Sequence, residues 1–279
     1  MVEQAERLLA DPDRLARYAG FLHRELPRAA AAPRPGFLSR RIAGKHDVLL
    51  RRTAGLLRPG AILEFGVYAG TSARLLARVC PFRKIHGFDS FEGFPQDGRP
   101  DWQLDFSRID LPRVPANVLL HPGWFDETVP RFLSELTAPV ALVHIDCDLY
   151  SSTRTVLQAL ASHGHLKPGL PIVFDELLNY DTHLWNEMLA LFEVLDENSL
   201  GIRWTNVGGR VRLAPDALGR LASGDFGYGW EADRAAGFRT QAAVVLTSAP
   251  AAETPAPDDL VEALRLQTGR FRDGALRRA

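Results

Sequence analysis

The chain has 279 residues, 46% of them hydrophobic and 24% charged, a composition typical of a folded globular protein with one large or two small domains. Its 33 lysines and arginines nearly balance 34 aspartates and glutamates, and the net charge of -1 argues against a nucleic-acid partner. No apolar run approaches the roughly 20 residues that span a bilayer, and the first residues lack the apolar stretch of a signal peptide. Two cysteines, Cys80 and Cys147, are too few and too far apart for a disulfide framework or a cysteine-ligated zinc site. We therefore expect a cytoplasmic protein with no membrane partner.

The first 58 residues have apolar positions at three- and four-residue spacing, which predicts helices over 3–9, 12–26 and 45–57. An Ala/Pro stretch at 28–36 interrupts them. We expect residues 1–58 to form an N-terminal helical extension that acts as a lid or in oligomerisation. The apolar stripes suggest a homo-oligomer, a dimer or tetramer, although they can equally pack on the same chain.

After residue 58, short apolar runs alternate with helical stretches, which predicts an α/β fold with a parallel sheet covered by helices on both faces. Helices are expected to start near Gly70, Phe125 and Tyr150. The predicted strands are 61–66, 84–89, 117–121, 140–146, 171–175, 201–206 and 241–247. Further helices are predicted at 182–196 and 258–266, and a glycine- and aromatic-rich segment that includes 225–230 is long enough for a lid or interface element. The domain prediction is one α/β domain over 59–248 and a C-terminal tail over 249–279.

In such a sheet, ligands bind beyond the carboxyl ends of the strands. The first strand ends in Glu64-Phe65-Gly66, followed by Val67 to Ser72. Gly66 and Gly70 let the backbone approach a ligand closely, and Thr71 and Ser72 can cap the next helix. The spacing is G-x-x-x-G rather than G-x-G-x-x-G, so the loop is a poor match to a dinucleotide pyrophosphate cradle.

The second and third strands also end in residues that suit a nucleoside. Asp89 follows the second strand, where an acidic side chain commonly accepts hydrogen bonds from ribose hydroxyls; the alternative is a loop or capping aspartate. After the third strand, Gly123-Trp124-Phe125 places aromatic rings that can stack on adenine or, alternatively, open the next helix as a hydrophobic staple.

Four acids follow the fourth and fifth strands, Asp146 and Asp148 after one, Asp175 and Glu176 after the other. Crowded carboxylates repel one another unless they are protonated or bridged by a cation. Hard oxygen ligands favour Mg²⁺, with Mn²⁺ or Ca²⁺ as substitutes. The alternative is that these aspartates are strand-end caps.

The histidines suit mainly structural roles. His144 lies inside an apolar strand and is interpreted as a packed, hydrogen-bonded core residue. His163 and His165 mark a helix end. His183, with Tyr180 and Trp185, follows the acidic turn closely enough to line a substrate pocket, although Trp185 can equally belong to the core.

Together these motifs resemble the metal-dependent class I S-adenosylmethionine methyltransferases, most closely the macrocin O-methyltransferase family of antibiotic-sugar tailoring enzymes. The resemblance covers about residues 58–196, in the right order. That family has Gly where Cys147 stands and a second Asp where Glu176 stands. The segments that carry the resemblance are Glu64-Phe65-Gly66-Val67 with Gly70-Thr71-Ser72, Gly87 to Pro95, Gly123 to Pro130, Asp146 to Thr153, and Pro168-Gly169 before Asp175-Glu176.

The resemblance implies a Rossmann-like class I methyltransferase fold, a mainly parallel seven-stranded sheet with one antiparallel strand, spanning 59–248. It implies an S-adenosylmethionine- and Mg²⁺-dependent O-methyltransferase acting on a small-molecule hydroxyl, a sugar of a glycosylated natural product. Asp146, Asp175 and Glu176 would hold the metal, and Asp148 with Asp146 would be catalytic. The residues implied in cofactor binding are Glu64, Phe65, Gly66, Tyr68, Gly70, Thr71, Ser72, Asp89, Ser90, Phe91, Gly123, Trp124, Phe125 and Asp146.

Three alternatives stay open. One is a nucleotide-dependent oxidoreductase, which the missing third glycine disfavours. Another is a non-catalytic scaffold that kept the fold, which the retained acid cluster disfavours. Within the methyltransferase interpretation, a catechol-like acceptor can chelate a metal as two neighbouring sugar hydroxyls do.

Overall fold

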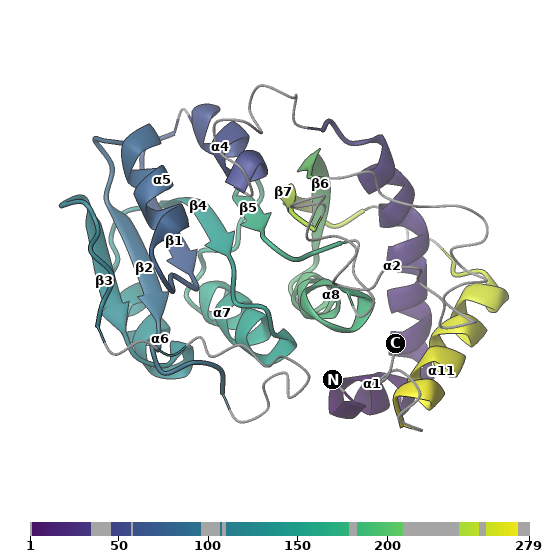
Figure 1. Ribbon diagram of the computed structural model, residues 1–279. Coiled ribbons are helices and arrows are strands. Elements are labelled where there is room, and N and C mark those ends of the chain that lie inside the picture. Colours follow the sequence, from purple (N-terminus) through teal and green to yellow (C-terminus); the bar gives the residue numbers. More distant parts are fainter. Residues whose placement is uncertain are drawn as a thin grey trace.

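The computed structural model describes residues 2–34, 46–56, 58–95, 107, 110–178, 183–208, 240–250 and 255–272. A seven-stranded sheet forms its centre (Figure 1). The strands are β1 (Ala61–Phe65), β2 (Ile85–Asp89), β3 (Val118–Pro122), β4 (Val140–Ile145), β5 (Pro171–Phe174), β6 (Leu200–Val207) and β7 (Ala242–Ser248). Each lies within a residue or two of its predicted position.

The strand order is β3-β2-β1-β4-β5-β7-β6. Strands β1 to β5 pair in parallel, whereas β7 pairs antiparallel with both β5 and β6. The predicted fold class, a mainly parallel seven-stranded sheet with one antiparallel strand, is therefore confirmed. Every residue of β1 is buried, because helices cover both faces of this central strand.

One face of the sheet carries α4 (Asp47–Ala54) and α5 (Thr71–Val79), and the other carries α6 (Phe125–Glu135), α7 (Tyr150–Ser162) and α8 (Glu187–Glu197) (Figure 1). Alternate strand residues belong to opposite faces. Ile62, Leu142 and Val173 pack with α4 and α5, whereas the following residues Leu63 and Val143 pack with the other layer.

The remaining helices α1 (Val2–Leu9), α2 (Pro12–Ala31) and α11 (Asp258–Arg272) lie together beside α8 and β6 (Figure 1). Tyr18 of α2 is fully buried, and its ring centroid lies 4.8 Å from that of Phe192 in α8. Trp204 of β6 donates a hydrogen bond from Nε1 to Glu25 of α2 at 3.0 Å. Among the described residues, the apolar stripes of the N-terminal helices thus pack on the same chain.

The helices differ from the prediction mainly at their ends. Helix α2 continues to Ala31, past the expected break at Arg28, because three alanines with high helix propensity follow Pro27. Helix α8 begins at Glu187, after the short 3₁₀ helix η2 (His183–Trp185), rather than at 182. The predicted segment at 225–230 and Tyr180 lie outside the described residues. No helix in the described ranges combines the length and apolarity that crossing a membrane requires.

Candidate active site

The carboxyl ends of the parallel strands are joined by backbone hydrogen bonds, which bring the predicted site loops to one edge. Gly66 N–H donates to Phe88 O at 2.9 Å, and Gly123 N–H donates to Asp89 O at 3.0 Å. On the other side of β1, Asp146 N–H donates to Phe65 O at 2.8 Å. The loops after β1, β2, β3 and β4 therefore form one continuous rim.

Three residues on this rim have strained backbones. Tyr68, Phe91 and Asp148 have φ of 45°, 57° and 61°, a left-handed conformation that costs an L-residue about 1–2 kcal/mol. The one other non-glycine residue with positive φ in the described ranges is Ser199. Such strain clusters at functional sites, where the surrounding structure maintains it. The strained backbone of the loops after β1, β2 and β4 therefore marks them as candidates for a functional site.

Gly66 brings the loop after β1 against the end of β4. Its φ is +90°, and a Cβ at this position would lie 1.8 Å from the carbonyl oxygen of Asp146. Any side chain here would push the two loops apart. The turn ends at Gly70, which is left-handed with φ +74° and serves as the N-cap of α5 without a side-chain hydrogen bond.

The expected capping of α5 by Thr71 and Ser72 was wrong. Because Gly70 occupies the cap position, Thr71 is already the first residue of the helix. Thr71 is exposed and receives a hydrogen bond from Arg74 at 3.4 Å, whereas Ser72 is buried.

Asp89 holds the loop after β1 in place. Its Oδ2 accepts hydrogen bonds from Val67 N–H at 2.8 Å and Tyr68 N–H at 2.7 Å, and its Oδ1 accepts one from Phe91 N–H at 2.7 Å. A carboxylate offers about four acceptor sites, so capacity for one ligand hydroxyl remains. Next to it, the Ser90 hydroxyl donates to Gly93 O at 2.9 Å and shapes the following turn.

Two residues of the predicted cofactor set lie beneath the rim. Glu64 and Phe65 are fully buried. The Phe65 ring stacks on Phe88 with centroids 5.1 Å apart, and the half-buried Phe125 ring meets it edge-on at 5.8 Å. Phe125 thus links the core to the rim. Beside it, the carbonyl of half-buried Trp124 accepts from Thr128 N–H at 3.0 Å in the first turn of α6.

The acids after β4 and β5 share one neighbourhood. Ile145 pairs with Phe174, so the next residues, Asp146 and Asp175, leave adjacent strands at the same level. Asp146 and Asp148 are half-buried, whereas Asp175 and Glu176 are buried. Asp148 is anchored through its carbonyl, which accepts a hydrogen bond from Asn186 Nδ2 at 2.6 Å.

Glu187, which sequence reasoning missed, lies among these acids. The side chain is fully buried, and its pKa is raised well above the ordinary value, first by burial and then by the charges of Asp148, Asp146 and Asp175. A hydrogen bond from Thr153 Oγ1 at 3.2 Å opposes the shift only in part. The signal in the sequence is an acid in the first turn of a helix, followed directly by five apolar residues, Met188 to Phe192.

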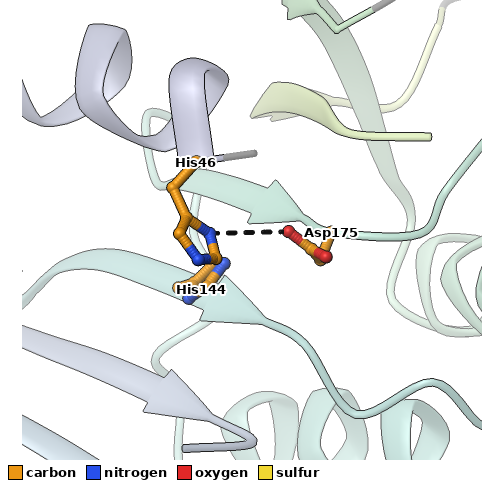
Figure 2. Close-up of side chains that lie close together, drawn as sticks. All are labelled: His46, His144 and Asp175. Atoms are coloured by element: carbon orange, nitrogen blue, oxygen red, sulfur yellow. Dashed lines mark ion pairs between the residues drawn. The ribbon is translucent and has the colours of Figure 1, made fainter. Parts of the chain in front are cut away.

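A second buried group lies on the α4 face of the same edge. His46, at the start of α4, has its Nδ1 3.8 Å from Asp175 Oδ1 (Figure 2). The His46 and His144 rings are nearly perpendicular, with centroids 6.3 Å apart. His144 lies fully buried, and its Nδ1 is 3.1 Å from Glu64 Oε1. Burial lowers the pKa of His144, but the hydrogen bond and charge of Glu64, with the charges of Asp146 and Asp175, raise it overall.

The interpretation of His144 as a hydrogen-bonded core residue agrees with this geometry, whereas His46 was not singled out because no motif surrounds it. Ligand atoms of His46, His144 and Asp175 lie within 4.8 Å of one another, the one such trio of His, Cys, Asp or Glu in the described ranges. The predicted metal ligands Asp146 and Glu176 are not part of this trio.

Trp185, for which the sequence left both a pocket and a core position open, is fully buried. Its ring meets that of Tyr18 edge-on, with centroids 6.4 Å apart, so Trp185 belongs to the core.

Comparison with known proteins finds a family match for the central part of the chain. Residues 63–177 match the family model described as a methyltransferase domain, over less than half of the chain. This span runs from β1 through β5 and contains the whole rim. No curated protein matches the chain.

Several solved methyltransferase structures are similar. CalS11, a calicheamicin methyltransferase, is 25% identical, with 74% of this chain and 90% of that chain covered at a TM-score of 0.43. The O-methyltransferase TomG from Streptomyces achromogenes, solved with S-adenosylmethionine, is 17% identical, covering 77% and 92% at 0.42. MycE from the mycinamycin pathway, solved with Mg and S-adenosylhomocysteine, is 18% identical, covering 82% and 55% at 0.38. At these TM-scores the likenesses assign no ligand to this chain.

The chain therefore carries a methyltransferase domain on a Rossmann-like α/β sheet, and the prediction of a methyltransferase is confirmed. The assignment to the macrocin family stays a prediction.

Proposed function

We propose that the chain is an S-adenosylmethionine-dependent O-methyltransferase that methylates a hydroxyl of a small molecule, with a sugar of a glycosylated natural product as acceptor. The observation that carries the proposal is that the methyltransferase-domain match and the rim of the sheet cover the same part of the chain. The methyltransferase-domain match ends at residue 177, just after the acids of β5, and the rim within it gathers strained loops and carboxylates. The sugar acceptor follows the motif resemblance in the sequence.

The rim residues would bind the cofactor in a defined orientation. The remaining acceptor capacity of Asp89 suits a ribose hydroxyl, because its other sites already hold the backbone of Val67, Tyr68 and Phe91. The turn from Gly66 to Gly70 lets the methionine part approach the backbone. Gly123, Trp124 and Phe125 would enclose the adenine. Bound S-adenosylmethionine supplies an electrophilic methyl group on a positively charged sulfur.

The carboxylates would provide deprotonation and metal binding. Asp148 takes the proton of the acceptor hydroxyl as the O–CH₃ bond forms and the S–CH₃ bond breaks. Asp146, Asp175 and Glu176 would hold Mg²⁺, which lowers the pKa of the hydroxyl. Their oxygen donors suit that ion, and they lie beside Glu187, whose pKa is raised first by burial and then by the charges of Asp148, Asp146 and Asp175.

Calorimetry with S-adenosylhomocysteine, with and without Mg²⁺, tests the cofactor part of the proposal. We expect saturable binding to the wild-type chain and to Glu135→Ala, which alters an exposed acid at the end of α6. Absence of binding would favour the scaffold interpretation, and tight binding of NAD(H) instead would favour the oxidoreductase.

Turnover of a panel of sugar-bearing and catechol acceptors, followed by release of S-adenosylhomocysteine, tests the chemistry. Asp146→Ala should abolish turnover while much of the cofactor affinity remains. Unchanged turnover in this variant, or full turnover in EDTA without metal, would refute the metal role.

A further inference from the structure

We propose that His46, His144 and Asp175 form a binding site for a divalent transition-metal ion such as Zn²⁺. The inference does not depend on the proposed function, although Asp175 takes part in both. Two imidazoles and one carboxylate are a ligand set that such ions favour and that Mg²⁺ disfavours.

The sheet places these side chains on one face by register. Glu64 pairs with His144 across β1 and β4, and His144 pairs with Val173 across β4 and β5. Because side chains alternate along a strand, Val173 and Asp175 leave β5 on the same side as His144. That face is covered by α4, which begins directly after His46 (Figure 2).

The distances fit an ion that draws the ligands together slightly. The ligand atoms lie within 4.8 Å of one another, and His46 Nδ1 is 3.8 Å from Asp175 Oδ1. Two donors that are each about 2.1 Å from a metal can be separated by at most about 4 Å. Side-chain movements that shorten these separations by less than about 1 Å would therefore bring all three donors within reach of one ion.

The surroundings of His144 prepare one nitrogen for a metal. Its Nδ1 is engaged by Glu64 Oε1 at 3.1 Å, which leaves Nε2 as the ligand atom. Nε2 is buried and has no hydrogen-bond partner among the described residues, in a side chain that is 0% exposed. A carboxylate that orients a metal-binding histidine from behind is a common second layer of zinc sites.

Asp175 is oriented by a neighbouring side chain, as His144 is by Glu64. Its Oδ1 accepts a hydrogen bond from Gln241 Nε2, and Gln241 is fully buried beside β7. This contact orients the carboxylate toward His46. An ion bound by three protein groups keeps a fourth position for water or substrate.

The test is a titration of chelator-treated protein without a histidine tag, using Co²⁺ and its visible absorption bands. We expect one equivalent of Co²⁺ to bind and to be displaced by Zn²⁺ at far lower concentrations than by Mg²⁺, because the two imidazoles favour Zn²⁺. His46→Ala and His144→Gln should weaken Co²⁺ binding by more than the roughly 10- to 100-fold expected of the supporting variant Glu64→Gln. His23→Ala, which removes an exposed histidine from α2, is the control and should not change it.

Further variants separate this site from the magnesium site. Asp146→Ala should retain Co²⁺ affinity even if it loses Mg²⁺-dependent turnover, and Asp175→Asn should lose Co²⁺ binding. Circular dichroism checks that each variant is folded. If His144→Gln does not fold, the Co²⁺ affinity of His46→Ala alone tests the proposal. Wild-type protein without a saturable Co²⁺ site, or a folded His46→Ala variant with wild-type affinity, would overturn the proposal whatever the outcome for Mg²⁺.

Discussion

Replacing Gly66 with alanine tests how tightly the loop after β1 is fitted to the end of β4. A left-handed φ of +90° costs an alanine about 1–2 kcal/mol. The new Cβ would lie 1.8 Å from Asp146 O, so the two loops must separate by more than 1 Å, and overpacking of this kind costs about 1–3 kcal/mol. We expect the free energy of unfolding to fall by about 2–5 kcal/mol. Urea unfolding followed by circular dichroism measures it.

The matched control is Gly164→Ala, after α7. Gly164 also has a left-handed φ, +70°, but a Cβ there would meet nothing within 4 Å. This variant should therefore show the conformational cost of about 1–2 kcal/mol alone. If the two variants lose the same stability within about 0.5 kcal/mol, the close approach of Gly66 to Asp146 is not a real constraint.

Three further predictions concern other parts of the fold. The pKa of His86 is lowered to about 4, first by burial and then by His121 and Lys84, so the folded protein binds fewer protons than the unfolded chain between pH of about 4 and the ordinary 6.5. Stability should thus be fully present above pH of about 6.5 and decline as the pH falls toward 4, and His86→Phe should flatten this decline in unfolding midpoints measured across that range. Asp89→Asn should weaken binding of S-adenosylhomocysteine about 10-fold in calorimetry, because it replaces charged hydrogen bonds to the loop amides; unchanged affinity would contradict its positioning role. Glu25→Ala should lower the free energy of unfolding by about 1–3 kcal/mol in thermal or urea unfolding, because Trp204 Nε1 loses its buried acceptor, whereas Glu25→Gln can keep that bond and should cost less.

The order of strands and helices could be predicted from the sequence because its causes are local. Strand β1 is a short apolar run, and α7 begins at the Tyr150 predicted for it. Since the carboxyl ends of parallel strands share an edge, the neighbourhood of Asp146 and Asp175 also followed from the sequence. The same reasoning placed Asp89 beside the loop after β1.

The partners of these side chains were decided only by the tertiary structure. Glu64 carries the motif of the loop after β1, yet its carboxylate contacts His144, eighty positions later in the chain. Asp89 binds backbone amides, and His46 reaches Asp175 from a short helix that no motif marks. Strand register, the face each residue takes and the docking of α4 set these contacts, and no local pattern encodes them. The sequence by itself thus determined that the candidate site residues gather at one edge of the sheet, while packing determined which atoms meet there.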